Sequence, residues 1–155
     1  MLKRKAFTLI ELLVVIAIIG ILSSMAMIAL TGTREKGRDA TRKGDLALIK
    51  SALEVYYAEQ KPNKFNVPAT NPSNMDTEAH ARTATGMTTD YIKTIPVDPT
   101  KDTTTPYIYR ASTDGQDYAV YAQLETASDS QIKDKDPVAG ARPGSYTNCF
   151  WVEND

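Results

Sequence analysis

The sequence has little of what catalytic and metal-binding sites are usually built from. It contains one cysteine, Cys149, and one histidine, His80, among its 155 residues. A single cysteine excludes a disulfide within the chain and a cysteine-based zinc cluster, and the histidine has no companion ligands at the spacing of a metal site. The sequence also lacks a phosphate-binding glycine loop, a GxSxG elbow and a recognised Ser/His/Asp arrangement. We therefore expect a protein that is not an enzyme.

An excess of charge of one sign is also missing. The formal net charge is −1 at pH 7, whereas domains that bind duplex nucleic acid usually have a strongly basic surface. A chain of 155 residues is long enough for one compact domain with an additional element, and too short for two large domains.

What the sequence does have is a long apolar run from Phe7 to Leu30 that contains no proline and follows three basic residues. As a helix this run is about 36 Å long, which exceeds the hydrocarbon core of a bilayer, roughly 30 Å thick. We predict a helix that spans the membrane over residues 7–30. Only five of its residues are not plainly apolar: Thr8, Glu11, Gly20, Ser23 and Ser24.

Two general classes of N-terminal segment are compatible with this composition. A cleaved secretory signal has an apolar core of about 7–15 residues, which is shorter than this run, and it should not hold a carboxylate near its start. A plain membrane anchor tolerates Glu11, because a charge costs roughly 3 kcal/mol at the centre of a membrane helix and less near its end. The residues around Glu11 favour a third class.

Residues 7–11, Phe-Thr-Leu-Ile-Glu, come directly after the basic leader and directly before Leu-Leu-Val-Val-Ile. This arrangement resembles the N-terminal signal of type IV pilins and of the pseudopilins of type II secretion. The resemblance implies that prepilin peptidase removes residues 1–6 by cutting between Ala6 and Phe7, and that the new amino group of Phe7 is methylated. Ala6 stands where the family usually has glycine.

The family resemblance also implies a role for Glu11. When subunits stack into a filament, the ammonium of Phe7 and the carboxylate of a neighbouring Glu11 can lie side by side in an apolar core, where neither charge is stable alone. The implied partners are other copies of the chain, prepilin peptidase, the inner-membrane pilus or secretion assembly machinery, and the lipid bilayer before assembly. The implied location is the cytoplasmic membrane for the single-pass precursor, and then an extracellular or periplasmic filament.

Residues 31–155 are predicted to form a pilin-like globular domain that begins with an amphipathic helix over residues 33–61. Leu46, Ile49 and Leu53 form its apolar stripe, and Pro62 ends it. The charges at the start of this helix have mixed signs, which is typical of a solvated helix surface. They are Arg34, Glu35, Lys36, Arg38, Asp39, Arg42, Lys43 and Asp45.

The remaining segments are a long connection over residues 62–105, with a short helix at Thr77–Thr83, and a β-sheet region over residues 106–155. Alternating apolar residues predict a hairpin of Tyr107–Ala111 and Tyr118–Leu124, with its turn at Asp114-Gly115. Residues 146–153 are predicted as a third strand. A long helix on a small antiparallel sheet is an α+β fold, and the resemblance implies the same fold.

The segment from Tyr91 to Pro96, together with the prolines that follow it, resembles the middle of major pseudopilins, which bind calcium in a loop near the sheet. Four aspartates could supply oxygen ligands, although no EF-hand pattern is present and aspartate is also a common turn residue. They are Asp98, Asp102, Asp114 and Asp117. No other cofactor is expected.

The sequence leaves three functions open. The first is a structural subunit of a type IV pilus-like filament, the second is the major pseudopilin of a type II secretion system, and the third is a membrane-anchored binding domain that does not polymerise. Pilins proper often close their last segment with a disulfide, which a sequence with one cysteine cannot form, and this is the main argument for the pseudopilin as the alternative to the pilus-like subunit. Adhesion, motility, DNA uptake and secretion are not distinguished.

Overall fold

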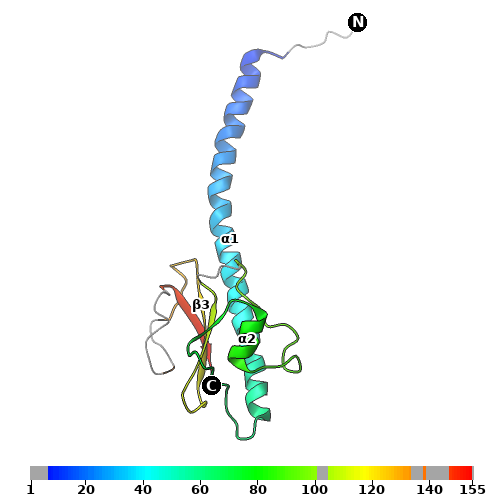
Figure 1. Ribbon diagram of the computed structural model, residues 1–155. Coiled ribbons are helices and arrows are strands. Elements are labelled where there is room, and N and C mark those ends of the chain that lie inside the picture. The colour runs from blue at the N-terminus through cyan, green and yellow to red at the C-terminus, as the bar shows by residue number, and fades with distance from the viewer. Residues whose placement is uncertain (1–6, 101–104, 134–137, 139–146, 155) are drawn as a thin grey trace. The chain divides into compact units, whose positions relative to one another are not determined.

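A computed structural model describes residues 7–100, 105–133, 138 and 147–154, and its helices and strands are drawn in Figure 1. The chain divides into two compact units, Met1–Lys36 and Gly37–Asp155. Helix α1 contributes residues to both units. The elements in chain order are α1 (Leu9–Glu59), β1 (Ser73–Met75), α2 (Glu78–Thr85), β2 (Tyr107–Ala111), β3 (Tyr118–Gln123) and β4 (Cys149–Glu153).

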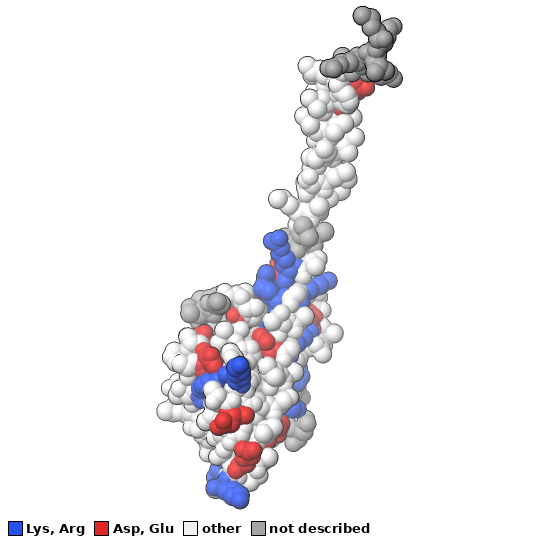
Figure 2. All heavy atoms as spheres, turned by 90° about the vertical axis from the view of Figure 1, so that its right-hand side faces the viewer, with Lys and Arg blue, Asp and Glu red and all other residues white. Residues whose placement is uncertain are grey.

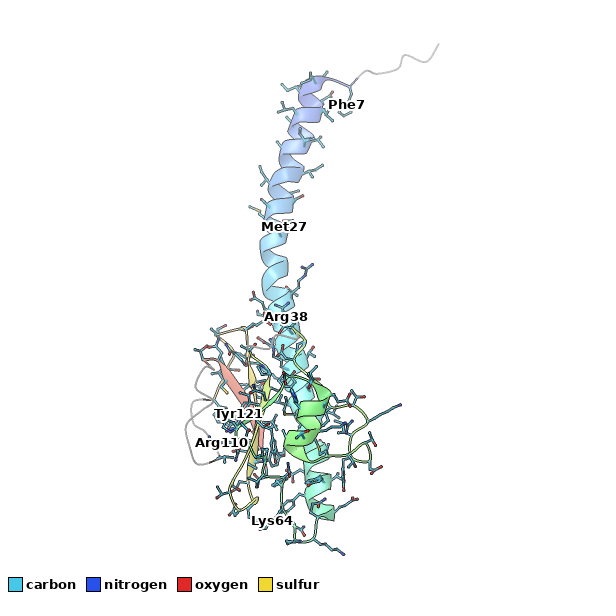
Figure 3. All side chains as sticks on the ribbon, viewed as in Figure 1. Phe7, Met27, Arg38, Lys64, Arg110 and Tyr121 are labelled. Carbon is cyan, nitrogen blue, oxygen red and sulfur yellow. The ribbon has the colours of Figure 1, made fainter. Side chains whose placement is uncertain are left out.

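The described part of the first unit consists of the apolar beginning of α1, with nothing packed on it. The large apolar side chains from Phe7 to Met27 are exposed, from 45% at Val15 to 81% at Leu9, and they project from the helix on all sides (Figure 3). By length and composition this helix can cross a membrane. An apolar surface of this size is stable only against lipid or other protein.

The second unit is built on a four-stranded antiparallel sheet with the order β1-β2-β3-β4. The hairpin of β2 and β3 and its turn are confirmed, and β3 ends at Gln123, one residue earlier than predicted. Gly115 in the turn has a φ of 71°. A Cβ atom there would also lie 2.9 Å from the carbonyl oxygen of Phe65, so both backbone conformation and space require glycine.

Helix α1 covers one face of this sheet, and the core of the second unit lies between them. Leu46, Ile49 and Leu53 of α1 are fully buried, and fully burying such a side chain stabilises the fold by about 1.5–3 kcal/mol. The predicted apolar stripe is thus confirmed. The sheet residues in the same core are Met75, Tyr107, Tyr109, Ala111, Tyr118, Val120 and Ala122.

The hydroxyl groups of the buried tyrosines are satisfied at the edges of this core. Tyr107 donates a hydrogen bond to Asp45 of α1 at 2.8 Å, and Tyr118 donates one to Glu54 of α1 at 3.0 Å. Burial raises the pKa of Tyr107, and the neighbouring Asp45 carboxylate raises it further. These bonds fix where the helix lies along the sheet, because each tyrosine reaches one particular carboxylate.

The opposite face of the sheet carries a second buried cluster, which contains the single cysteine. Tyr121 and Trp151 pack with ring centroids 6.0 Å apart, and Cys149 is fully buried beside them. The strand that holds Cys149 and Trp151, β4, begins at residue 149 rather than at the predicted 146. Residue 146 lies outside the described residues, and residues 147 and 148 form a bend.

The predicted connection over residues 62–105 contains two regular elements. Strand β1 was not predicted, because it has only three residues and is held by its pairing with β2 rather than by a pattern of its own. Helix α2 runs over Glu78–Thr85 instead of Thr77–Thr83. Thr77 is its N-cap, whose side chain accepts a hydrogen bond from the His80 N–H at 3.2 Å. Helix α1 ends at Glu59, shortly before Pro62 and two residues before the predicted end.

We predict that residues 33–155 fold without the apolar segment, because the buried hydrophobic cluster of the second unit contains no described residue from before Leu46. Circular dichroism of this fragment should show cooperative thermal unfolding, and analytical ultracentrifugation should show a monomer. A disordered fragment, or one that is oligomeric at micromolar concentration, would contradict this prediction.

Candidate functional site: the N-terminal docking segment and a buried ion-pair cluster

Thr8 and Glu11 form a closed pair of interactions at the start of α1. The Thr8 backbone N–H donates to Oε2 of Glu11 at 2.8 Å, and the Thr8 hydroxyl donates to the same oxygen at 2.7 Å. In return the Glu11 N–H donates to the Thr8 hydroxyl oxygen at 3.3 Å. This is a capping box, which satisfies backbone donors that the first turn of a helix otherwise leaves without partners.

The capping box gives Glu11 a role within its own chain that the sequence analysis missed. The pattern that predicts it, threonine followed three residues later by glutamate before an apolar run, is present at residues 8–11. Both bonds from Thr8 go to Oε2. Because an ionised carboxylate offers about four acceptor positions, Glu11 can hold this cap and still accept a bond from another donor.

Glu11 is the only charged residue between Lys5 and Arg34. Figure 2 shows a long white stretch of helix with red spheres near one end. Phe7, which precedes the capping box, has 76% of its surface exposed. Ala6, the predicted residue before the cleavage site, lies outside the described residues. The predicted docking residues therefore lie at an accessible end of an unpaired apolar helix.

A second group of charges lies in the interior of the other unit. Asp39 and Arg42 of α1 and Asp98 of the segment before β2 are each at most 3% exposed. Arg42 Nε donates to Asp98 at 2.7 Å, and Arg42 Nη2 donates to the other oxygen of Asp98 at 3.2 Å. Arg42 Nη1 donates to Asp39 at 2.8 Å. One guanidinium thus holds two buried carboxylates.

The segment after β3 closes over this cluster. Asp39 accepts hydrogen bonds from the N–H groups of Glu125 and Thr126, each at 2.9 Å. The Glu125 side chain accepts bonds from Arg42 at 2.7 Å and from Arg38. The cluster therefore ties two segments far apart in sequence, before β2 and after β3, to the same two turns of α1.

The surroundings favour the ionised forms of Asp39, Arg42 and Glu125. Burial raises the pKa of Asp39, but the two N–H groups and Arg42 outweigh it and hold the pKa below its usual value of 3.8. Burial lowers the pKa of Arg42, and its carboxylate partners more than reverse this effect. Arg38 and Arg42 hold the pKa of Glu125 below 4.5. A buried charge is stable only with such partners.

The prediction that this charged segment is a solvated surface is wrong for two of its residues. Asp39 and Arg42 continue the apolar stripe of Leu46, Ile49 and Leu53 with the same spacing of three and four residues, so they face the sheet rather than water. The position of the charges in the stripe was the signal that could have identified them. Arg34 and Lys36 are exposed, as predicted.

The aspartates proposed as calcium ligands do not come together among the described residues. Asp98 is paired with Arg42, Asp114 accepts a bond from Ser112 in the β2–β3 turn at 2.6 Å, and Asp117 contacts Asn154 at 3.3 Å. Asp102 lies outside the described residues. Within the described ranges no three His, Cys, Asp or Glu side chains are grouped to hold a metal ion.

We predict that Arg42→Met destabilises the fragment of residues 33–155 by about 3–5 kcal/mol, because it leaves Asp39 and Asp98 buried without a counter-ion. Urea unfolding followed by circular dichroism measures the change. Arg34→Met is the matched control, because Arg34 is exposed and its loss should change the free energy of unfolding by less than about 0.5 kcal/mol. Equal stabilities of the two variants would contradict the prediction.

Comparison with known proteins agrees with this geometry. Residues 1–27 match the family model for the prokaryotic N-terminal methylation motif. The type II secretion system core protein G of Escherichia coli is 32% identical over 102 residues, which are 63% of this chain and 67% of that protein. The protein of the same name from Pseudomonas aeruginosa is 31% identical over 116 residues, 70% of this chain and 75% of the relative.

A pilus protein is also similar over a shorter stretch. Fimbrial protein Q of Moraxella bovis is 41% identical over 66 residues, 43% of this chain and 42% of that protein. No solved structure matches the chain significantly. The methylation motif, the long apolar helix and the antiparallel sheet agree with these relatives, and the chain belongs to the family of pilins and pseudopilins that includes the type II secretion system core protein G.

Proposed function

We propose that this chain is the repeating structural subunit of a pseudopilus-type filament that serves protein secretion. It is made as a single-pass precursor in the cytoplasmic membrane, cut between Ala6 and Phe7, methylated on Phe7 and assembled into a helical homopolymer in the periplasm or outside the cell. The observation that carries the proposal is an apolar helix segment whose large side chains are exposed from Phe7 to Met27 and whose one charge is a carboxylate near its beginning.

Cleavage would create the partner that this carboxylate lacks. It removes the basic residues Lys3, Arg4 and Lys5 and leaves the amino group of Phe7 as the only cation before Arg34. When helices pack together and exclude lipid and water, this ammonium and a Glu11 carboxylate must neutralise each other, because either charge alone is strongly disfavoured in such surroundings. The ammonium of one subunit can bond to Glu11 of its neighbour while Thr8 holds Oε2 of the same carboxylate.

The proposed partners follow from the family. Prepilin peptidase recognises the leader, an inner-membrane assembly machinery adds subunits, and the bilayer holds the precursor. The secretion core proteins of Escherichia coli and Pseudomonas aeruginosa match 63% and 70% of this chain and the fimbrial relative 43%, which supports a pseudopilus over a long pilus. The fimbrial relative supports a pilus subunit as the second candidate.

The family consists of structural subunits rather than enzymes, and we propose no catalytic activity and no organic cofactor for this chain. We also assign no role to calcium. Asp98, which is 3% exposed, already has Arg42 as its counter-ion at 2.7 Å.

We predict that the subunit in membranes and filaments begins at Phe7. Intact-mass measurement should show the loss of residues 1–6 and the gain of one methyl group on Phe7. In a strain without prepilin peptidase, the full chain should accumulate in the membrane fraction. Met1 retained in assembled filaments would contradict the proposed processing.

The two roles of Glu11, capping its own helix and pairing with a neighbour, can be separated by a pair of variants. Glu11→Gln keeps an acceptor for Thr8, since glutamine also serves in a capping box, but it removes the charge. Thr8→Ala removes the partner in the cap and keeps the charge. We predict that Glu11→Gln abolishes filaments, because it leaves the ammonium of Phe7 unpaired, and that Thr8→Ala forms filaments at a reduced level.

The measurement for this pair is the yield of sheared filaments relative to processed subunit that remains with the cells. Normal processing and membrane insertion of both variants show that the defect lies in assembly. Filaments of Glu11→Gln at the wild-type level, with loss of filaments in Thr8→Ala, would show that Glu11 acts only as a helix cap and would contradict the docking role.

A further inference from the structure

Five basic residues follow the apolar segment of α1, and they fall into two groups. Arg38, Arg42 and Lys43 have carboxylate partners in the second unit. Arg34 and Lys36 are exposed, and neither forms an ion pair with another residue in the part of the chain that the structure describes. Figure 2 shows blue spheres just past the end of the white stretch of helix. Arg34 and Lys36 are therefore cations that the described fold does not use.

The positions of these two residues along α1 match the depth of a lipid headgroup. The helix is continuous from Leu9 to Glu59, so the rise from Leu9 to Arg34 is about 38 Å, or about 35 Å with the average tilt of a membrane helix. The hydrocarbon core of a bilayer is about 30 Å thick, and the bilayer with its headgroups is about 40–45 Å thick. When α1 begins at one edge of the hydrocarbon core, Arg34 lies among the headgroups of the opposite leaflet.

The chemistry of both side chains fits the phosphate group of a lipid. Guanidinium and ammonium groups donate strong, charge-assisted hydrogen bonds to phosphate oxygens, and their long stems can lie along apolar surface while the charged end reaches the phosphate. Residues two positions apart lie on nearly opposite sides of a helix, so each meets a different lipid. Glu35, which lies between them, is partly buried and leaves a net charge of +1, which favours anionic over zwitterionic headgroups.

The side of the membrane makes the two cations notable. In the proposed orientation residues 31–155 are translocated, and the segments next to a membrane helix on that side usually hold few lysines and arginines. Arg34 and Lys36 thus work against the orientation that the chain has to adopt. A placement that is unfavourable for insertion, and that the described fold does not need, points to a partner outside the subunit.

We propose that Arg34 and Lys36 bind the phosphate groups of anionic phospholipids in the outer leaflet of the cytoplasmic membrane before the subunit assembles. The two contacts fix how deeply α1 lies in the bilayer, and so they hold its first turn, with Phe7 and Glu11, near the opposite surface. This inference rests on the proposed function and names the lipid that holds the unassembled subunit.

The test measures which lipids remain bound to the full chain. The chain is placed in nanodiscs of equal parts phosphatidylcholine and phosphatidylglycerol, and native mass spectrometry counts the lipids that stay attached to the released subunit. We expect Arg34→Gln combined with Lys36→Gln to lower the ratio of phosphatidylglycerol to phosphatidylcholine about fivefold or more, since each basic residue near a membrane surface favours anionic lipid by about that factor. The basic leader contributes equally to all variants.

Two further variants serve as controls. Lys61→Gln combined with Lys64→Gln removes the same charge from exposed positions past the other end of α1, and it should leave the lipid ratio unchanged. Arg34→Lys combined with Lys36→Arg keeps both charges and should retain the wild-type ratio. A wild-type ratio in the Arg34→Gln and Lys36→Gln variant, or an equal fall in the control that lacks Lys61 and Lys64, would overturn the inference.

Filament yield separates a lipid partner from a protein partner. Loss of filaments in the variant without Arg34 and Lys36, with its lipid ratio unchanged, would assign both residues to an acidic surface of another subunit and overturn the inference. The lipids are counted on unassembled subunits, so the result does not depend on polymerisation. Glu11→Gln should therefore keep the wild-type lipid ratio, and wild-type filament levels in that variant would overturn the proposed function alone.

Discussion

The carboxylate of Glu11 has to be stabilised in surroundings that contain almost no other polar group, and the behaviour of the N-terminal helix depends on how this is achieved. In the isolated subunit the partner is Thr8, which donates two hydrogen bonds at 2.7 and 2.8 Å to one carboxylate oxygen. In a filament the proposed partner is the ammonium of a neighbouring Phe7. The same side chain can thus begin the helix in the membrane and bind the next subunit after cleavage, because the two partners need different positions on the carboxylate.

The part of α1 in the second unit holds two segments of the chain, one before β2 and one after β3, through a buried arginine. Arg42 lies in the interior and binds Asp39, Asp98 and Glu125, so it fixes segments on either side of the β2–β3 hairpin. A buried ion pair adds little net stability compared with apolar packing, but breaking it is costly. The cluster is therefore best understood as setting the positions of these segments on the helix.

Much of the fold follows from periodicity alone. The stripe of Leu46, Ile49 and Leu53 and the alternation in β2 and β3 identify the helix, the hairpin and the sides on which they meet, since those features are local. Strand β1 has three residues and exists through its pairing with β2, so no local pattern reveals it. The residue type of Arg42 predicts an exposed side chain, whereas its place in the stripe predicts an interior one, and the structure agrees with the stripe. At the docking segment, the family resemblance indicates the roles of Phe7 and Glu11. The spacing of Thr8 and Glu11 is that of a capping box, a local signal that the sequence analysis did not use and that the hydrogen bonds between them reveal.

The central claim is that each Glu11 carboxylate accepts a bond from the methylated amino group of Phe7 in an adjacent subunit. Electron cryo-microscopy of wild-type filaments, at a resolution that shows side chains, tests it most directly. The account predicts a distance of about 3 Å between the Phe7 nitrogen of one subunit and a carboxylate oxygen of Glu11 in its neighbour. A filament in which Glu11 contacts only Thr8 of its own chain, with the Phe7 nitrogen paired elsewhere, would contradict it.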